Sequence, residues 1–310
     1  MGDQRRRTSI LLTCLLASSS VLTLPLRGQS AQESAASGSA FAKSNLHAWA
    51  FEEYDAVSRS PAERAQVLET IGLKKAGYVG RNVERMKEFD AYVAAYKARG
   101  IELIAVWTPV NTDAPLQEPH IQMFLEAVER HKLRLQWWVT LEQLKQGDQQ
   151  TAEKAAATVR QLNADATKRG LRLALYGHGR DSWFTQPENQ LEIIGRLPPA
   201  DAAGVGIAYN FHHAHSQLDR FAVFFPKMRP HLIAVNLNGM RAAGPMILPI
   251  GEGDREQEMI SIIHKSGYRG PVGLLHHQRT LDAATGLARN IAGLRQILTA
   301  IGDTAGASTY

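Results

Sequence analysis

Short apolar runs alternate with longer amphipathic segments along most of this chain. Runs of about four to eight apolar residues have the length of buried strands, whereas apolar residues spaced three and four apart mark one face of a helix. On this pattern, strands are predicted over residues 46–51, 76–79, 101–106, 133–139, 171–176, 205–209, 232–237 and 272–275.

A helix is predicted after each of these strands. Ser60 followed by Pro61 is typical of a helix start, because serine caps the first free N–H groups and proline fits the first helical position. Three of the predicted helices stop at a glycine directly before a strand, where a left-handed residue can turn the chain back to the sheet. These glycines are Gly100, Gly170 and Gly267.

Eight strands that are each followed by a helix predict an α/β fold, a single closed (β/α)8 TIM barrel. The alternative is a doubly wound open sheet, but no G-x-G-x-x-G turn follows the first strand. The barrel is predicted over residues 45–302, with 303–310 as a C-terminal tail.

The N-terminal segment is typical of a signal peptide. Arg5, Arg6 and Arg7 precede an apolar stretch over 10–26, and small residues follow at 28–31. A membrane anchor is the alternative, but this stretch is interrupted by polar residues and is short for a span of about 20. We therefore predict a signal peptide over 1–30, a flexible lead over 31–44, and an exported, periplasmic or secreted protein without a stable membrane anchor after cleavage.

Cysteine content and charge exclude some classes of site and partner. Cys14 is the only cysteine and lies in the predicted signal, so the mature chain would have no disulfide or thiolate site. The formal net charge is +5, and residues 1–30 carry four Arg and one Asp, so about +2 remains. A nearly neutral body gives no reason to expect a nucleic acid partner.

Polar side chains gather where the predicted strands end. In a TIM barrel these carboxyl ends and the loops after them build the working site. His178, His213 and His276 follow three different strands and could bind a divalent transition metal ion as neutral imidazoles. The same rings could instead move protons between the carbons and oxygens of a sugar.

Further residues at the strand ends are candidates for contacts to substrate. Amide side chains suit sugar hydroxyls because each carries a donor and an acceptor, and indole faces suit sugar rings. The amide candidates are Asn210, Asn236, Asn238 and Gln278, the indole candidates are Trp107 and Trp183, and His276 is a further candidate for a substrate contact. Glu252, in a Gly-Glu-Gly-Asp loop, is predicted to lie near the mouth as a catalytic candidate, with a simple helix-start loop capped by Asp254 as the alternative.

Over residues 46–298 the sequence resembles the xylose isomerase-like TIM barrel superfamily, the sugar phosphate isomerase/epimerase relatives. The resemblance is carried by LALYGH ending at His178, GIAYNFHH ending at His213, and AVNLNG over 234–239. PIGEGD over 249–254 and SGYRGPVG over 266–273 complete it. The segments are similar to those of an exported bacterial branch, which implies carbohydrate metabolism.

The resemblance also implies one divalent metal ion held by carboxylates and histidines, and here the sequence departs from the family. Tyr176, Asn210 and Asn236 stand at positions where the family typically carries Glu, Asp and His, and His276 or His277 stands at the position of the last Glu. Only His178 and His213 keep their type. A hard Mg²⁺ or Mn²⁺ site needs the missing carboxylates, so a His-bound zinc or iron, or no metal, remains open.

Two functions follow from these observations. The first is an isomerase, epimerase or lyase that acts on a small sugar or modified glycoside by proton transfer, with His178 and His213 as acid and base. The second is a carbohydrate-binding barrel that has lost the metal site and the reaction.

Overall fold

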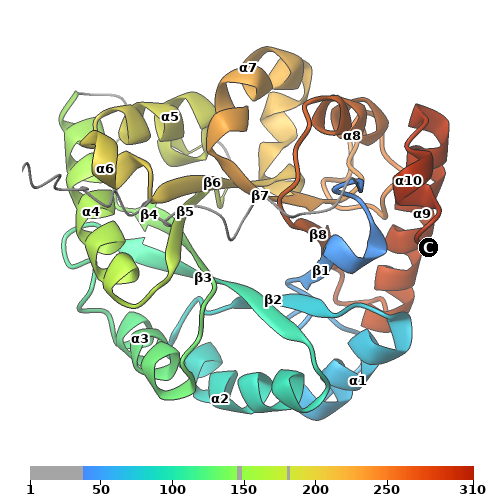
Figure 1. Ribbon diagram of the computed structural model, residues 1–310, viewed down its shortest axis with the longest axis horizontal. Helices are drawn as coiled ribbons and strands as arrows, with labels where there is room; N and C mark the ends of the chain where they lie inside the picture. Colours follow the sequence, from blue (N-terminus) through green and yellow to red (C-terminus); the bar gives the residue numbers. More distant parts are fainter. Residues whose placement is uncertain (1–37, 145–148, 180–181) are drawn as a thin grey trace, which may run out of the picture. The chain divides into compact units, whose positions relative to one another are not determined.

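The computed structural model describes residues 38–144, 149–179 and 182–310. Eight parallel strands close into a barrel in the order of the sequence, and helices cover the outside (Figure 1). The strands are β1 Leu46–Trp49, β2 Lys75–Val79, β3 Glu102–Asn111, β4 Gln136–Glu142, β5 Arg172–Tyr176, β6 Val205–Asn210, β7 Leu232–Leu237 and β8 Val272–Leu275. The predicted (β/α)8 barrel is confirmed.

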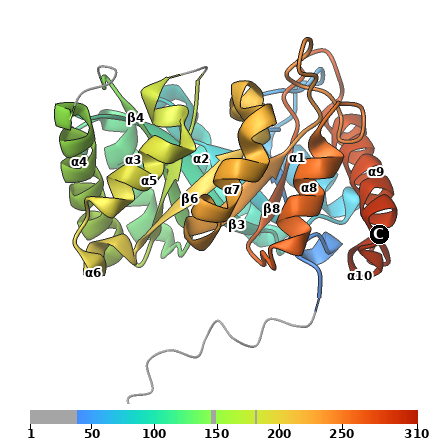
Figure 2. The ribbon, with the colours of Figure 1, turned by 90° about the horizontal axis from the view of Figure 1, so that it is seen from above.

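Helices connect the successive strands, and α5, α7, α8 and α9 follow one another around the barrel (Figure 2). The α-helices are α1 Pro61–Ile71, α2 Val83–Ala98, α3 Pro119–His131, α4 Gln149–Lys168, α5 Pro187–Gly195, α6 Pro199–Ala202, α7 Phe221–Met228, α8 Glu256–Lys265, α9 Ala283–Ile301 and α10 Thr304–Ala307. The 3-10 helices are η1 Lys43–Asn45, η2 Trp183–Thr185, η3 Phe211–Arg220 and η4 Arg229–His231.

Helix ends follow the expected chemistry. The Ser60 side chain accepts from the N–H of Glu63 at 3.3 Å, and the Glu63 carboxylate accepts from the N–H of Ser60 at 2.7 Å. Gly100, Gly170 and Gly267 all have positive φ, at 63°, 70° and 69°. The predicted turns back to the sheet are therefore confirmed.

Strand β4 begins three residues later than its apolar run, at Gln136 instead of Leu133. Lys132 takes the left-handed conformation after α3, and the N–H of Leu133 donates to Val128 O at 3.0 Å. An apolar residue in this place belongs to the helix C-cap, where it packs back on the last turn. Leu133 therefore belongs to the C-terminal capping turn of α3, and the prediction that it begins the strand is wrong.

Two apolar cores meet at the strands, one under the helices and one inside the barrel. Side chains alternate along a strand, so Trp138 points into the barrel while Trp137 packs outward, 5.5 Å from the Phe124 ring. Inside, Trp49, Trp138 and Tyr176 pack together, and their neighbours in this layer include the small residues Ala105, Ala174, Ala208 and Ala234. The interior is a packed floor below the mouth.

The ends of the described chain pack against each other. Phe41 is fully buried although it falls in the predicted lead, and Tyr310 donates to Phe41 O at 2.7 Å. Ser39 also donates to the Asp303 carboxylate. The predicted signal over 1–30 and residues 31–37 of the lead lie outside the described residues. In the described part of the chain, no helix is long and apolar enough to cross a bilayer.

Gly293 of α9 touches the loop between β7 and α8, and we expect its replacement to be costly. A Cβ built at Gly293 would lie 1.6 Å from the carbonyl oxygen of Ile250, a backbone atom that cannot rotate away. Gly293→Ala is therefore expected to lower the free energy of unfolding by about 3 kcal/mol in urea titrations.

Gly195, the last residue of α5, provides the matched control. No atom lies within 4 Å of a Cβ built there, so Gly195→Ala is expected to raise stability by about 0.5 kcal/mol. Equal unfolding midpoints for the two variants would contradict the close approach at Gly293.

Candidate active site

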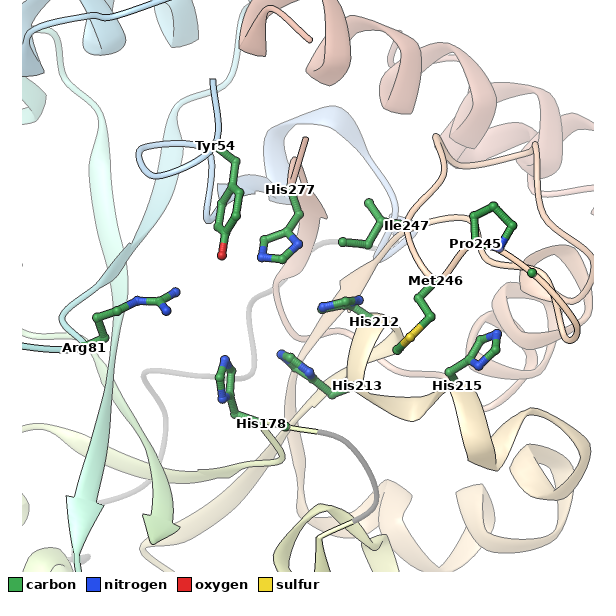
Figure 3. Close-up of a pocket in the computed structure, with 12 residues that line it drawn as sticks. Tyr54, Arg81, His178, His212, His213, His215, Pro245, Met246, Ile247 and His277 are labelled. Carbon is green, nitrogen blue, oxygen red and sulfur yellow. The ribbon is translucent and has the colours of Figure 1, made fainter. Parts of the chain in front are cut away.

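A pocket of about 900 Å³ lies at the carboxyl ends of the strands (Figure 3). It is formed by side chains from the loops after β1, β2, β5, β6, β7 and β8. The lining residues are Tyr54, Arg81, His178, Gly179, His212, His213, His215, Gly244, Pro245, Met246, Ile247 and His277. None of these described lining residues is an aspartate or a glutamate.

Four histidine rings form a continuous arc in this pocket (Figure 3). The centroid distances are 4.5 Å from His178 to His213, 4.4 Å from His213 to His212, and 4.8 Å from His212 to His277. His277 in turn packs on Tyr54, with 3.5 Å between the ring centroids. The arc therefore presents several ring nitrogens to one cavity.

Local structure explains why these rings face inward. His178 lies two residues beyond Tyr176 of β5, and His277 two residues beyond Leu275 of β8, so each continues the inward alternation of its strand. Asn210 ends β6 and accepts from the N–H of His212 at 3.1 Å, which caps the start of η3. This turn directs His212 and His213 into the pocket.

Burial keeps the imidazoles neutral. Loss of solvation lowers the pKa of His178 to about 4, with Arg81 and His212 lowering it further. Burial, His212 and Arg81 lower the pKa of His277 to about 3, and burial and the adjacent His178 hold the pKa of His213 well below its usual range. At neutral pH the rings of His178, His213 and His277 therefore each have one nitrogen that donates and one that accepts.

The floor under the arc is a network of neutral hydrogen bonds. The hydroxyl oxygen of Tyr176 accepts from Trp49 Nε1 at 3.0 Å and from Asn210 Nδ2. Trp107 donates to the Thr140 hydroxyl at 2.9 Å, and its ring stacks on His178 with centroids 4.3 Å apart. The indole and the phenol thus hold His178 in place from below.

Arg81 projects into the pocket from the end of β2 (Figure 3). Its Nη2 donates to the Glu53 carboxylate, and Arg85 Nε lies 3.6 Å from the other oxygen of the same group. The Arg81 guanidinium also lies over the Trp107 ring at 5.6 Å from the centroid. The orientation of Arg81 is therefore fixed by one carboxylate and one indole.

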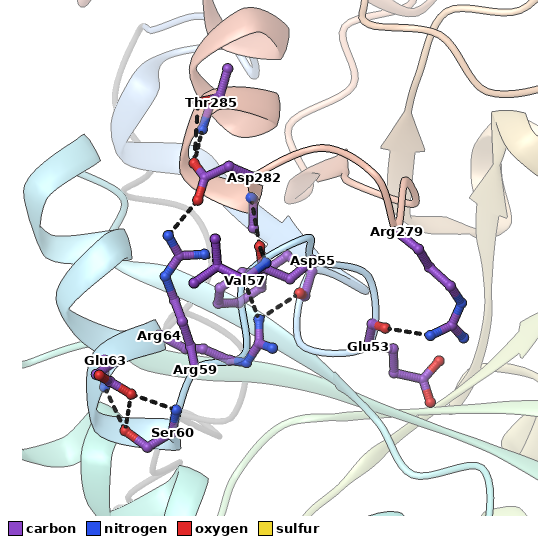
Figure 4. Close-up of polar contacts among 12 residues, drawn as sticks. Glu53, Asp55, Val57, Arg59, Ser60, Glu63, Arg64, Arg279, Asp282 and Thr285 are labelled. Carbon is purple, nitrogen blue, oxygen red and sulfur yellow. Dashed lines mark hydrogen bonds and ion pairs between the residues drawn. The ribbon is translucent and has the colours of Figure 1, made fainter.

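The loop that carries Tyr54 is fixed by polar contacts around Asp55 (Figure 4). The buried Asp55 carboxylate accepts from Arg64 Nη1 at 3.1 Å, from the N–H of Ala283 at 3.0 Å, and from Arg59. These donors lie in α1, in α9 and in the loop itself. Asp55 therefore ties the loop to the first helix of the barrel and to the helix after its last strand. Tyr54 is thereby held against His277.

The loop between β7 and α8 supplies the apolar side of the pocket. Asn238 Nδ2 donates to Gly239 O and to Met246 O, both at 2.9 Å, which holds Met246 near the mouth. Asp254 does not cap α8, because its carboxylate accepts from the N–H of Ala242. Glu256 instead accepts from the N–H groups of the Gly-Glu-Gly-Asp segment, so this segment has a structural part in the loop.

The structure brings together four of the predicted site residues. His178 and His213 line the pocket, and Trp107 and Asn210 line the narrow space below it. Asn236 lies deeper in the barrel, fully buried and hydrogen-bonded to His47 at 3.1 Å. The pocket and the space below it therefore contain four of the predicted site residues.

The other candidates lie elsewhere, and their predicted places in the pocket are wrong. His276 points to the helix layer, because its ring packs on Gly286 of α9, while His277 faces the pocket. Glu252 is exposed and paired with Arg289 on α9. Trp183 packs on the outer core. Asn238 and Gln278 reach the backbone of the pocket loop instead of the cavity.

Tyr54 and the Pro245–Met246–Ile247 segment lie in the pocket without having been predicted. Neither has a sequence signal, since both are placed by contacts with distant parts of the chain. Arg81, His212 and His277 lie at strand ends and could have been selected by the alternation of inward and outward positions. The alternation also explains why His277, and not His276, is the pocket residue.

The residues present do not fit the metal site that the resemblance implies. Tyr176 and Asn210 stand in place of two carboxylates and are bonded to each other, and His276 points away. Among the described residues, no group of three or more His, Cys, Asp or Glu is placed to hold a metal ion. A hard divalent ion would find no negative ligand here.

No protein-family model matches this sequence, and no curated protein matches it. Several solved structures share its fold at low identity. The 3-keto-D-glucoside 4-epimerase YcjR from E. coli matches with a TM-score of 0.63 and 16% identity over 82% of this chain and 100% of that one. An IolI protein with a bound zinc atom matches with a TM-score of 0.64 and 11% identity over 82% and 98%.

A xylose isomerase-like TIM barrel protein from Mycobacterium smegmatis in complex with magnesium gives a TM-score of 0.55 and 14% identity over 83% of this chain and 97% of that one. At these identities the likeness establishes the fold. The chain has the fold of the xylose isomerase-like TIM barrels.

Proposed function

We propose that this chain is a sugar isomerase/epimerase-like enzyme that acts on a small sugar or modified glycoside by proton transfer. The observation that carries the proposal is the arc of four imidazoles around one pocket at the mouth of the barrel, three of which burial keeps neutral. Structural neighbours that are named as sugar epimerases support it.

His178 and His213 are the proposed acid and base. A neutral ring nitrogen can take the proton from a carbon next to a carbonyl, while the electrons of the C–H bond form a C=C bond and the π electrons of the carbonyl move to its oxygen. The ring that has become an imidazolium, or the second ring once it has received that proton, returns the proton to the neighbouring carbon or oxygen; the two ring centroids lie 4.5 Å apart. Because the donor set does not fit a metal ion, no step is assigned to one.

The second candidate function is a carbohydrate-binding barrel without catalysis. The closed neutral network of Tyr176, Trp49 and Asn210 favours it, because this network stands where the family resemblance implies catalytic metal ligands. Such a protein would bind a saccharide in the pocket and leave its C–H bonds intact.

The two functions differ in deuterium exchange. The enzyme is expected to incorporate solvent deuterium at a carbon beside the carbonyl when it is incubated in D₂O with aldoses, ketoses and ketoglycosides, as mass spectrometry can show. Binding measured by calorimetry, without exchange for any bound sugar, would reject the enzyme and support the binder.

We also propose that the protein is exported and lacks a stable membrane anchor afterwards. The basic and apolar N-terminal segment supports this proposal. Expression of the full chain in a bacterial host is expected to give a shortened protein in the periplasm or medium, starting near residue 31 by N-terminal sequencing. An intact N-terminus in the cytoplasm would contradict it.

A further inference from the structure

We propose that the substrate of this pocket carries a negatively charged group, a carboxylate or a phosphate, which binds Arg81 beside Tyr54 and His277. The inference rests on the proposed function and specifies its substrate class. It starts from the composition of the pocket wall, where the described lining residues include an arginine and five histidines but no carboxylate.

Arg81 has donor capacity that the protein does not use. Only its Nη2 donates to a carboxylate, that of Glu53, and its buried Nε finds no acceptor among the described residues. The Arg81 side chain is 35% exposed and faces the cavity. An arginine held on one side and free on the other can bind a carboxylate or phosphate through two parallel hydrogen bonds.

The guanidinium groups near the pocket are not all fully paired with carboxylates. Glu53 is the carboxylate paired with Arg81, and it is shared with Arg85. Arg279 adds a third guanidinium, which lies 4.7 Å from the Tyr54 ring centroid and donates to the backbone oxygen of Glu53. The nearby Asp55 is already matched by Arg59 and Arg64. Arg279 therefore has no carboxylate partner among the described residues, and Arg81 shares its one carboxylate with Arg85.

The neighbours of Arg81 suit an anion as well. His277 and Tyr54 pack together at the cavity, and Figure 3 shows the Tyr54 hydroxyl pointing toward the space in front of Arg81. A hydroxyl and an imidazole N–H can donate to the remaining oxygens of the anion. A neutral sugar offers the free side of Arg81 only hydroxyl acceptors, whereas an anionic sugar offers charged oxygens that accept stronger, charge-assisted hydrogen bonds.

The test compares matched saccharides by calorimetry. Methyl β-D-glucuronide and methyl β-D-glucoside differ in one carboxylate, galacturonate and galactose form a second pair, and glucose 6-phosphate against glucose tests a phosphate. Wild type is expected to bind at least one anionic member about 10- to 100-fold more tightly than its neutral partner. Which pair responds distinguishes a carboxylate from a phosphate.

Arg81→Gln is expected to weaken binding of the anionic member much more than binding of its neutral partner, so that the preference is lost, and Arg81→Lys is expected to keep part of it. Arg220→Gln removes an equal charge from an exposed arginine paired with Glu188, and it is expected to leave the preference intact. Equal affinity of wild type for both members of every pair, or equal effects of the Arg81 and Arg220 variants, would overturn the inference.

Failure of the inference and failure of the proposed function give different results. Deuterium exchange on a neutral sugar, with no preference for anions, keeps the enzyme and rejects the anionic substrate. An Arg81-dependent preference for anions without exchange on any bound saccharide keeps the anion site and rejects the enzyme.

Discussion

Replacing His178 or His213 with asparagine is expected to slow deuterium incorporation into the substrate by about 10²- to 10⁴-fold. Asparagine keeps a hydrogen-bond donor and acceptor of similar reach, but it cannot take a proton at neutral pH. Because the two rings lie 4.5 Å apart and serve one cavity, the loss is expected in kcat while KM changes little. Mass spectrometry of the recovered sugar measures the exchange.

His131→Asn is the control for this experiment. His131 ends α3, pairs with Asp90 on the surface and is not among the residues that line the pocket. Its replacement is expected to leave exchange unchanged. Exchange at the wild-type rate in both His178→Asn and His213→Asn would show that neither ring transfers the proton.

Lowering the pH from 7 to 5 is expected to destabilise the fold by about 2 kcal/mol for each fully buried histidine. His47 lies inside the barrel, where burial lowers its pKa to about 3. Between pH 6.5 and about 3 the unfolded chain binds a proton that the folded chain refuses, so stability falls as the pH falls. His178 and His277 act in the same direction, by less because they are partly exposed. Urea unfolding at the two pH values measures the change.

The buried carboxyl of Glu52 has an effect on the pH dependence of stability that is opposite in sign to that of the histidines, and it provides a second test. Burial raises its pKa to about 7, and one of its oxygens accepts from the N–H of Val79 at 2.6 Å. Its contribution to stability is present at low pH and is lost as the pH rises through 7. Between pH 5 and 8 the free energy of unfolding of wild type is therefore expected to fall by about 2–3 kcal/mol relative to that of Glu52→Gln. His47→Gln is expected to reduce the loss of stability between pH 7 and 5. If both variants kept the wild-type dependence of stability on pH, burial of these two groups would not be its cause.

Most of the fold could be predicted because it depends on short-range patterns. Alternating apolar runs, the capping residues Ser60 and Glu63, and glycines such as Gly100 act within a few residues of where they stand. Parallel strands joined by helices form either a closed barrel or an open sheet. The barrel is the better prediction here, because the turn after the first strand has no G-x-G-x-x-G pattern typical of an open nucleotide-binding sheet. Strand β4 differs where one apolar residue, Leu133, packs on a helix end.

The candidate site was only partly predictable, since its details depend on contacts across the whole chain. His178 and His213 follow from their strands, but Tyr54 reaches the pocket because Asp55 binds Arg64 and Ala283 far along the sequence. Glu252 forms an ion pair with Arg289, and Asn238 donates a hydrogen bond to the carbonyl oxygen of Met246. The sequence shows only that such residues are polar. The tertiary structure is needed to show whether each side chain faces the cavity or binds the backbone of the loop around it.

The two ends of the described part of the chain pack together, and this affects how the protein can be attached to a surface. Phe41 and Tyr310 meet beside the start of β1, at the barrel end remote from the pocket, where Asn45 also binds Gly270 O at 2.8 Å. A tether attached after Tyr310 would leave from the closed end of the barrel, with the mouth still open to solution. Immobilised protein should therefore keep its full capacity for saccharides, which makes a surface-attached biosensor a suitable format for screening large glycan collections.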